Sequence, residues 1–334
     1  MRDIKKYFAA VAVSALLFVF LASSAFAITI KFAGHYPEEH PSTKLLYKAA
    51  AEVEQKTDGR VKIKIYPADQ LGDYTLLFQD IMRGSVDMGQ VNLPSEYDIR
   101  LESHCIPYIV KDYADIPKVF SYDSNFSNVF KKILDEKNIE FFGFNVIGLI
   151  GLGSKVEPKD PFNPNVDKGI LIRVPPMKVF QLSGKEMHFR TTTINWADIY
   201  SAMQTGVCDG WIGGTPDVNY LTFKDIQKYY VAYNSFVECN AFIMGKDIYK
   251  KLGADAQIVR DVFKQTAAAS FALAEKQDNF YMEKMEEAGL TILRPTPEQS
   301  KAMADFMHQK IWPQLYSLYG EEIFNAVRKD LGEI

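Results

Sequence analysis

Three short stretches, Ile28-Thr-Ile-Lys-Phe-Ala33, Arg60-Val-Lys-Ile-Lys-Ile-Tyr66 and Val86-Asp-Met-Gly-Gln-Val91, decide the fold class. The first two alternate apolar and polar residues, the period of a strand with one buried face. Between the three strands lie two segments with apolar residues on one helical face, 41–56 and 76–83. This βαβαβ order predicts an α/β fold with a parallel, helix-covered sheet that binds its ligand at the carboxyl ends of the strands.

The pattern continues through the chain and divides it into two lobes. A loop with three prolines, 157–164, precedes the second lobe. We expect lobe one at 28–147, lobe two with crossing strands mainly at 148–245, and a helical segment at 246–334 that packs across both lobes. Periodicity predicts further strands at 139–147, 170–174 and 208–212, an apolar and aromatic stretch at 229–244, and helices at 117–137, from 179, at 197–203, 254–286 and 298–319.

The N-terminus has the order of a secretory signal peptide. Basic residues at positions 2, 5 and 6 precede an apolar run from Tyr7 to Ala22, and Ala25-Phe-Ala27 forms a small-x-small cleavage site. The apolar run is short for a membrane span, which is the alternative. We therefore expect cleavage after Ala27 and a periplasmic protein, without a lipid anchor because no cysteine lies near the site.

Composition and motifs exclude several classes of protein. The formal net charge is −4 and no basic cluster is present, so a nucleic-acid partner is not expected. Nucleophile elbows, phosphate loops, zinc-protease motifs and Cys-x-x-Cys pairs are absent, and we expect no catalytic residues and no cofactor. Cys105, Cys208 and Cys239 are expected to be buried thiols, with one disulfide as the alternative.

A cluster after the first strand leaves two interpretations open. His35, Glu38, Glu39 and His40 are residue types that bind metals. The simpler interpretation is that His40-Pro41 marks the turn into the first helix and His35 lies at the end of a strand. We expect no metal.

A set of individually weak motifs, in one order and spacing, resembles the substrate-binding subunits of tripartite ATP-independent periplasmic (TRAP) transporters. The resemblance covers nearly the whole chain after the leader. It implies two α/β lobes, each a helix-covered mixed sheet, joined by crossing strands and a long helix, which close over an organic anion and deliver it to membrane subunits. The motifs are Lys31-Phe-Ala-Gly-His35, Val61-Lys-Ile-Lys-Ile-Tyr-Pro67, Gln70-Leu-Gly72, Gly84-Ser-Val-Asp-Met88, Ile106-Pro-Tyr-Ile109, Lys168-Gly-Ile-Leu-Ile-Arg-Val-Pro175 and Ala202-Met-Gln-Thr-Gly-Val-Cys-Asp-Gly210.

The resemblance implies that Arg173 clamps the ligand's acid group. A guanidinium presents parallel donors that match a carboxylate, and it stays charged in a closed cleft. The residue pattern alone fits an arginine paired with a neighbouring acid equally well. By position in the same motifs, further ligand contacts are expected at His35, Tyr74, Asn92, Trp196, Trp211, Gly213 and Asn240. For the aromatic residues, core packing is the alternative.

Two departures from the family pattern bear on the ligand. A second arginine that many members carry falls here near Leu149, and the usual Gln-Glu-Asn-Pro after Asp209-Gly210 is replaced by Trp211-Ile-Gly-Gly-Thr-Pro216. Fewer charged donors favour a monocarboxylate, such as a 2-oxo, hydroxy or aromatic acid, over a dicarboxylate. Gly213 and Gly214 either admit a larger tail or let backbone amides approach the anion.

Alternatives to this interpretation remain. A dicarboxylate, sulfonate or phosphate ester as the ligand, an ATP-driven importer as the partner, and an exported hydrolase are the other candidates. The receptor is expected to be monomeric.

Overall fold

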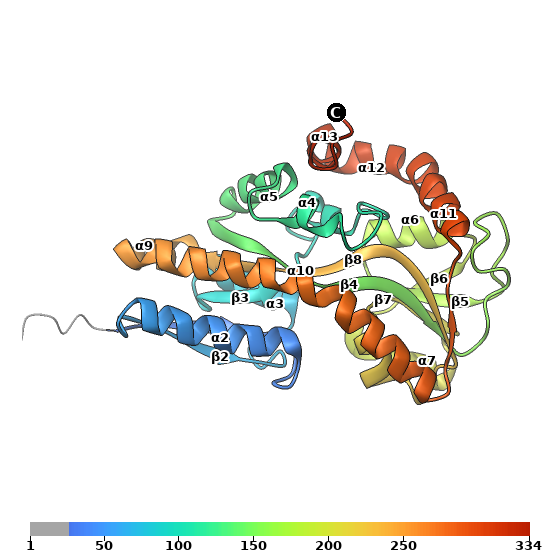
Figure 1. Cartoon of the computed structure of the whole chain (residues 1–334), viewed down its shortest axis with the longest axis horizontal. Helices are drawn as coiled ribbons and strands as arrows, with labels where there is room; N and C mark the ends of the chain where they lie inside the picture. The colour runs from blue at the N-terminus through green and yellow to red at the C-terminus, as the bar shows by residue number, and fades with distance from the viewer. Residues whose placement is uncertain (1–26) are drawn as a thin grey trace, which may run out of the picture.

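A single sheet runs through both halves of the molecule (Figure 1). The computed structural model describes residues 27–334, and its strands lie in the order β2-β1-β3-β8-β4-β7-β5-β6, with β9 beside β8. The strands are β1 (Ile28–Ala33), β2 (Val61–Tyr66), β3 (Met88–Val91), β4 (Ile139–Ser154), β5 (Leu171–Val174), β6 (Arg190–Thr193), β7 (Gly210–Gly214), β8 (Tyr229–Gly245) and β9 (Thr291–Leu293).

Each lobe contains a mixed part of this sheet. In lobe one, β1 is parallel to β2 and β3, and β8 runs antiparallel to β3. In lobe two, β5 is parallel to β6 and β7, and β4 runs antiparallel to β7. The predicted βαβαβ start and the predicted class, a two-lobed α/β fold with helix-covered mixed sheets, are confirmed.

Two long antiparallel strands connect the lobes. β4 and β8 pair from Ile139 opposite Gly245 in lobe one to Ser154 opposite Tyr229 in lobe two, with three register shifts along the way. The expected lobe boundary between residues 147 and 148 therefore falls inside β4, which continues seven residues beyond the end predicted from sequence. The connection is a pair of continuous strands, which is suited to hinge bending without a loose linker.

Helix α10 (Ala256–Glu287) spans both lobes, as predicted (Figure 1). Near its start, Val259 and Phe263 pack in the core of lobe one, and near its end Met282 and Met285 pack with Tyr230 of lobe two. The other α-helices of at least five residues are α2 (Pro41–Lys56), α3 (Tyr74–Arg83), α4 (Ile116–Phe120), α5 (Asn125–Asp135), α6 (Lys178–Glu186), α7 (Ile199–Thr205), α9 (Lys246–Lys251), α11 (Pro297–Lys310), α12 (Trp312–Tyr319) and α13 (Glu321–Asp330).

Two helices predicted as single segments are each broken in the structure. The segment 117–137 forms α4 and α5 because Ser124 caps the second helix, its hydroxyl accepting the N–H of Ser127 at 3.0 Å. The segment 298–319 forms α11 and α12, with Pro313 in the first turn of α12, where proline cannot continue the preceding helix.

The three cysteines are buried free thiols, as the simpler interpretation predicted. Among the helices of residues 27–334, none combines the length and the apolar composition that crossing a bilayer requires. The expected leader lies outside the described residues, except for Ala27.

Candidate ligand-binding cleft

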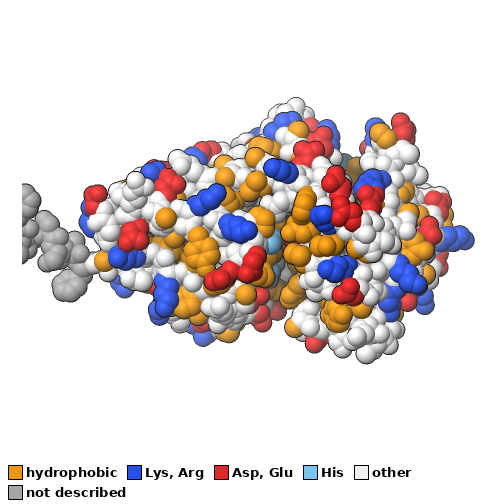
Figure 2. Space-filling view, turned by 60° about the horizontal axis from the view of Figure 1, so that its bottom comes forward, with side chains coloured by type: hydrophobic (Ala, Val, Ile, Leu, Met, Phe, Trp, Pro, Cys, Tyr) orange, Lys and Arg blue, Asp and Glu red, His pale blue; other side chains and the backbone are white. Residues whose placement is uncertain are grey.

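A hollow separates the two lobes on the face shown in Figure 2. Arg173, on β5, contributes a guanidinium to the lobe-two side, and its side chain is only 3% exposed. Its Nε donates to the carbonyl oxygen of Ile194 at 2.7 Å and its Nη1 to that of Ile212 at 3.2 Å. Two carbonyl oxygens leave most of the guanidinium's five N–H groups available to an anion.

The charge of Arg173 has no acidic partner among the described residues. Burial lowers the pKa of the guanidinium to about 10. The negative charges that Tyr74 and Cys208 carry when ionised raise this pKa and so oppose the shift. The group stays cationic at neutral pH. The alternative of a salt bridge to a neighbouring acid is therefore not supported, and Arg173 is a buried cation without an acidic partner in the described chain.

Gly213 on β7 makes room for this guanidinium. A Cβ at this position would lie 3.1 Å from Nη1 of Arg173 and 3.2 Å from Cγ of Pro175, and φ is +126°. At Gly214, a Cβ would collide with the ring of Trp211. The idea that these two glycines admit a larger ligand tail is therefore wrong, because protein side chains already fill the space.

Tyr74, the first residue of α3, lies across from Arg173 on lobe one. Burial raises the pKa of the Tyr74 phenol, and the positive charge of Arg173 opposes that shift. The same interaction appears in the pKa of Arg173. The predicted residues Tyr74 and Arg173 thus come together from the two lobes.

A chain of buried amides supports Asn92 at the end of β3. The side chain of Asn240 on β8 donates to Oδ1 of Asn92 and accepts from Nε2 of Gln90 at 3.3 Å. Gln90 Nε2 and Asn145 Nδ2 both donate to Oγ of Ser42, at 2.8 and 3.0 Å. Asn92 is partly exposed whereas Asn240 is 1% exposed, so Asn240 holds Asn92 in place from within the sheet.

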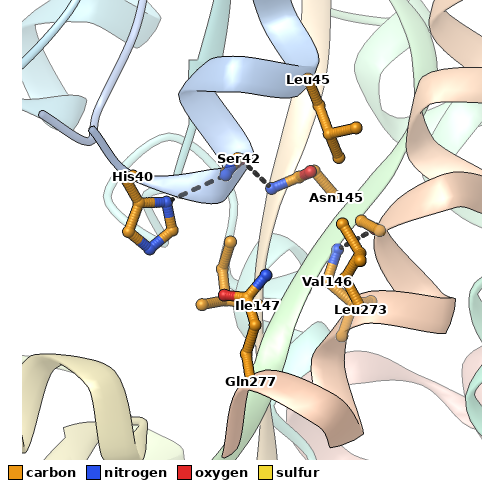
Figure 3. A pocket seen from close by; sticks show the side chains of 9 residues that line it. His40, Ser42, Leu45, Asn145, Val146, Ile147, Leu273 and Gln277 are labelled. Atoms are coloured by element: carbon orange, nitrogen blue, oxygen red, sulfur yellow. Dashed lines mark hydrogen bonds between the residues drawn. The ribbon is translucent and has the colours of Figure 1, made fainter. Parts of the chain in front are cut away.

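Next to this chain of amides is a small cavity of ≈ 10 Å³, which is room for about one water molecule (Figure 3). His40, Ser42 and Asn145 line it from one side and Gln277 of α10 from another. Oδ1 of Asn145 is fully buried with no hydrogen-bond partner in the described chain, as is Oε1 of Gln90. A water molecule in this cavity would have polar neighbours to bind.

The two histidines after β1 have different partners. His35 Nδ1 lies 2.9 Å from Oδ1 of Asp69, and both side chains are partly exposed in lobe one. His40 Nε2 lies 2.9 Å from Oδ2 of Asp217, with side chains 5% and 3% exposed. Asp217 belongs to the short helix α8 (Pro216–Val218) of lobe two, so the second pair joins the lobes.

His40 also explains why the first long helix begins where it does. Its Nδ1 accepts the backbone N–H of Ser42 at 3.1 Å, so it is the N-cap of α2, followed by Pro41. The turn interpretation of His40-Pro41 is confirmed. Within residues 27–334, no three His, Cys, Asp or Glu side chains are arranged to hold a metal ion.

The predicted tryptophans lie in different surroundings. Trp196 is 43% exposed, and its ring is 5.9 Å from that of Trp211. Trp211 is completely buried and packs on Phe223 with ring centroids 4.5 Å apart. Burial favours the core-packing alternative for Trp211. Its side chain presents no surface to a ligand in this structure, whereas Trp196 does.

Sequence reasoning missed three residues of the junction between the lobes: Tyr36, Asp217 and Glu238. Tyr36 stacks on His40, with centroids 4.1 Å apart, and its pKa is raised well above normal by burial and by Glu238 and Asp217. Burial and the charge of Asp217 raise the pKa of the Glu238 carboxyl to about 8. The apolar context of Glu238 in β8 was the available signal, because an isolated acid in a buried strand is unusual.

Leu149, at the place where the family resemblance puts an arginine in many members, lies in the apolar core. Its side chain is 2% exposed in the large apolar cluster, and its N–H donates to Oδ2 of Asp278 at 2.7 Å. The described part of the cleft therefore gains no second cation from this position.

Two lobes face each other across a hollow, with a buried cation on one and polar groups on the other, which is the arrangement expected of a solute-binding protein. The chain belongs to family 7 of the bacterial extracellular solute-binding proteins, whose family model matches residues 32–317. The resemblance to TRAP transporter subunits is thereby confirmed.

Relatives in this family support the same identification. The chain is 23% identical over 268 residues to the sialic acid-binding periplasmic protein SiaP of Vibrio cholerae, covering 78% of this chain and 80% of SiaP. It is also 23% identical to the C4-dicarboxylate-binding periplasmic protein DctP of Rhodobacter capsulatus, covering 92% of each chain. These relatives are periplasmic transport receptors and not enzymes.

The fold is shared with solved structures. A TRAP periplasmic solute-binding protein from Desulfovibrio salexigens with bound orotic acid superposes with a TM-score of 0.81 at 18% identity, covering 91% of this chain and 99% of that one. The chain therefore has the two-lobed fold of these solute-binding proteins, in agreement with its membership of the family.

Proposed function

We propose that the protein binds a small monocarboxylate between its lobes, with Arg173 holding the acid group, and delivers it to the permease as a monomer. The observation that carries this proposal is the buried guanidinium of Arg173, which has no acidic partner in the described chain. An anion that enters the closed cleft would neutralise it through charge-assisted hydrogen bonds. His35, Tyr74, Asn92 and Trp196 are the proposed contacts around the rest of the ligand.

Charge supports one carboxylate over two. Among the ionisable groups at the junction, Asp69, Asp217 and Glu238 are acidic, and the two histidines are already paired with carboxylates. A second ligand carboxylate would be desolvated beside these acids, at a cost of several kcal/mol unless donors compensate. Because one relative, DctP, is named as a C4-dicarboxylate-binding protein, dicarboxylates have to be compared with monocarboxylates as ligands.

A competition experiment tests the proposal. Thermal-shift screening followed by calorimetry would compare 2-oxo, 2-hydroxy, amino and aromatic monocarboxylates with succinate and malate. We expect at least one monocarboxylate to bind ten-fold or more tightly than either dicarboxylate. Succinate or malate binding ten-fold more tightly than every monocarboxylate would contradict the proposal and leave the fold and family unaffected.

We also propose that the protein is exported with a secretory leader that is removed. Export with cleavage after Ala27 would leave Ile28, the first residue of β1, at the mature N-terminus. N-terminal sequencing of the protein recovered from the periplasm would check that boundary.

A further inference from the structure

Glu102 is a completely buried acid with a partner in each of two helices. It lies in the 3-10 helix η1 (Ile99–Cys105). A buried carboxylate is costly unless hydrogen-bond donors surround it, so its donors indicate what it does. Oε1 accepts the hydroxyl of Tyr319 at 2.7 Å, and Oε2 accepts the backbone N–H of Lys178 at 3.2 Å. One carboxylate thus joins η1 to α12 and to the start of α6.

The two partners of Glu102 belong to different halves of the molecule. η1 packs against α5 of lobe one, and Asp98, which caps η1, also pairs with Lys137 just beyond α5 at 3.1 Å. α12 packs against η1, and the next helix, α13, packs on α5 as well. α6 instead follows β5 of lobe two, although all these helices share one apolar cluster above the sheet in Figure 1. Glu102 therefore brings a carboxylate from lobe one to a helix of lobe two.

α6 begins without a capping side chain of its own. Its N-cap residue is Met177, which forms no side-chain cap hydrogen bond. The first N–H groups of a helix lack partners within the helix, and the helix dipole favours an acid beside them. Glu102 supplies that acid at Lys178, the first residue of α6. Burial raises the pKa of the Glu102 carboxyl, and hydrogen bonds from Tyr319, Ser95 and the start of α6 oppose the shift.

A short, stiff turn connects the start of α6 to Arg173. Residues 174–177 separate Arg173 from α6, and two of them are prolines, whose rings fix φ. The N–H of Met177 donates to the carbonyl oxygen of Pro175 at 2.8 Å, which closes the turn. Such a turn has few ways to absorb a displacement, so a movement of the first turn of α6 is passed on to Pro175.

Pro175 and the guanidinium of Arg173 both pack over Gly213 of β7. The position that a Cβ of residue 213 would take is 3.1 Å from Nη1 of Arg173 and 3.2 Å from Cγ of Pro175. The ring and the guanidinium are therefore neighbours over one glycine. Because protein interiors are close-packed, a displacement of Pro175 bears directly on the position of Nη1.

We propose that Glu102 is a positioning residue for ligand binding: it caps α6 from lobe one and thereby fixes the Pro175 turn that places the guanidinium of Arg173. This inference rests on the proposed function, because it needs Arg173 to hold the ligand's acid group. A guanidinium binds a carboxylate through two parallel hydrogen bonds, so a small displacement lowers the affinity. Glu102 acts through α6 and the turn, without contact to the ligand.

Variants at both ends of the Glu102 carboxylate test this role. Calorimetry would measure the affinity for the tightest-binding of these probes: pyruvate, L-lactate, L-pyroglutamate, orotate, succinate and L-malate. Glu102→Ala should weaken binding about five-fold or more, because α6 loses its cap. Tyr319→Phe is the matched control: it removes the other hydrogen bond to the same carboxylate and leaves the cap. Its affinity should stay within about two-fold of the wild type, although urea unfolding should show both variants to be less stable.

Two further substitutions of Glu102 complete the series. Glu102→Gln keeps the length of the side chain, and its Oε1 can accept from Lys178 while its Nε2 donates to the Tyr319 hydroxyl. It should bring the affinity back to within about three-fold of the wild type. Glu102→Met fills the same space without an acceptor, and it replaces Glu102→Ala in the test if that variant does not fold.

A spectroscopic measurement reports the guanidinium itself without a ligand. Nε–H of Arg173 donates to the carbonyl oxygen of Ile194 at 2.7 Å, so its NMR resonance depends on that contact. The resonance is assigned by its absence in Arg173→Lys. It should shift in Glu102→Ala and stay in place in Tyr319→Phe, because only the first variant releases the start of α6. A purely structural role of Glu102 would leave the resonance of the folded protein unchanged.

The outcomes separate this inference from the proposed function. The inference needs both a weaker affinity and a shifted Arg173 resonance in Glu102→Ala; if either is missing, it is wrong and the monocarboxylate receptor stands. An equal loss of affinity in Tyr319→Phe also overturns it, because Glu102 would then act on the fold as a whole. If succinate or malate is the tightest probe, the monocarboxylate proposal fails, whereas the same two measurements still decide the role of Glu102. If no probe binds, the proposed function fails and the inference fails with it.

Discussion

The two sides of the cleft differ in how their polar groups are paired. On lobe one, His35 is paired with Asp69 and Asn92 accepts a hydrogen bond from Asn240. On lobe two, Arg173 has only two carbonyl oxygens and no carboxylate. These two lobe-one groups have partners within the protein, whereas the lobe-two guanidinium has no acidic partner in the described chain, and we expect a ligand to neutralise it.

This difference assigns the lobes different tasks. An unpaired buried charge gains much from an arriving counter-ion, so lobe two should account for most of the binding free energy. Pre-paired groups gain less, and lobe one should mainly close over the ligand and exclude water. The His40–Asp217 pair links both tasks because its two residues belong to different lobes, and we expect it to break when the lobes separate.

The largest expected effect is the loss of the lobe-two charge. Arg173→Ala should cost about 2–5 kcal/mol of binding free energy, the range for truncating one side of a buried charge pair. Arg173→Lys should recover part of this, since an ammonium keeps the charge but loses the two-pronged geometry. Calorimetry with the best monocarboxylate measures both.

Arg190→Ala is the matched control, because Arg190 lies on the neighbouring strand β6 and is exposed. Its affinity should equal that of the wild type. Undiminished affinity in Arg173→Ala would remove the distinction between the lobes.

The second prediction contrasts the two histidines. His40→Asn retains an N-cap acceptor for α2 but is too short to reach Asp217, so the closed state should lose about 1–3 kcal/mol, the cost of a buried group left without its partner. His35→Asn breaks only a partly exposed pair within lobe one and should change closure by less than about 1 kcal/mol.

Small-angle scattering with saturating ligand reports the closed fraction for both variants. We expect a larger radius of gyration for His40→Asn than for His35→Asn or the wild type. Equal radii in all three proteins would show that the His40–Asp217 pair does not stabilise closure.

The sequence was sufficient where the signal is local. Strand alternation predicted β1 and β2 to within a residue. The motif around β5 led to Arg173, whose contact with the ligand stays a prediction. The helix over 117–137 was predicted wrongly because apolar spacing continues through a break that the Ser124 cap decides. The two helices that were predicted as single segments are broken where a capping serine or a proline starts a new helix.

Contacts between distant residues were not predictable from one sequence. His40 and Asp217 are 177 residues apart, and nothing near either residue indicates the other. Trp211 was expected at the ligand from its position in the family motifs, but its ring fills the space that Gly153 and Gly214 leave inside lobe two. Whether side chains point inward or outward at a strand end depends on such neighbours.

The smallest expected effect concerns the glycine beside the lobe-two charge. In Gly213→Ala, the new methyl would lie 3.1 Å from Nη1 of Arg173, so the guanidinium must shift by a few tenths of an ångström. Such a shift misaligns the two parallel donors, and we expect affinity to fall three- to ten-fold, which is about 1 kcal/mol.

Gly206→Ala is the matched control: its φ of +82° is also left-handed, but no atom lies within 4 Å of the added methyl. Both variants should lose stability from backbone strain, of order 1 kcal/mol, in thermal or urea unfolding. Only Gly213→Ala should lose ligand affinity in calorimetry, because only its methyl group contacts the guanidinium of Arg173. Equal affinity losses in the two variants would mean that backbone strain, and not the position of the guanidinium, controls binding.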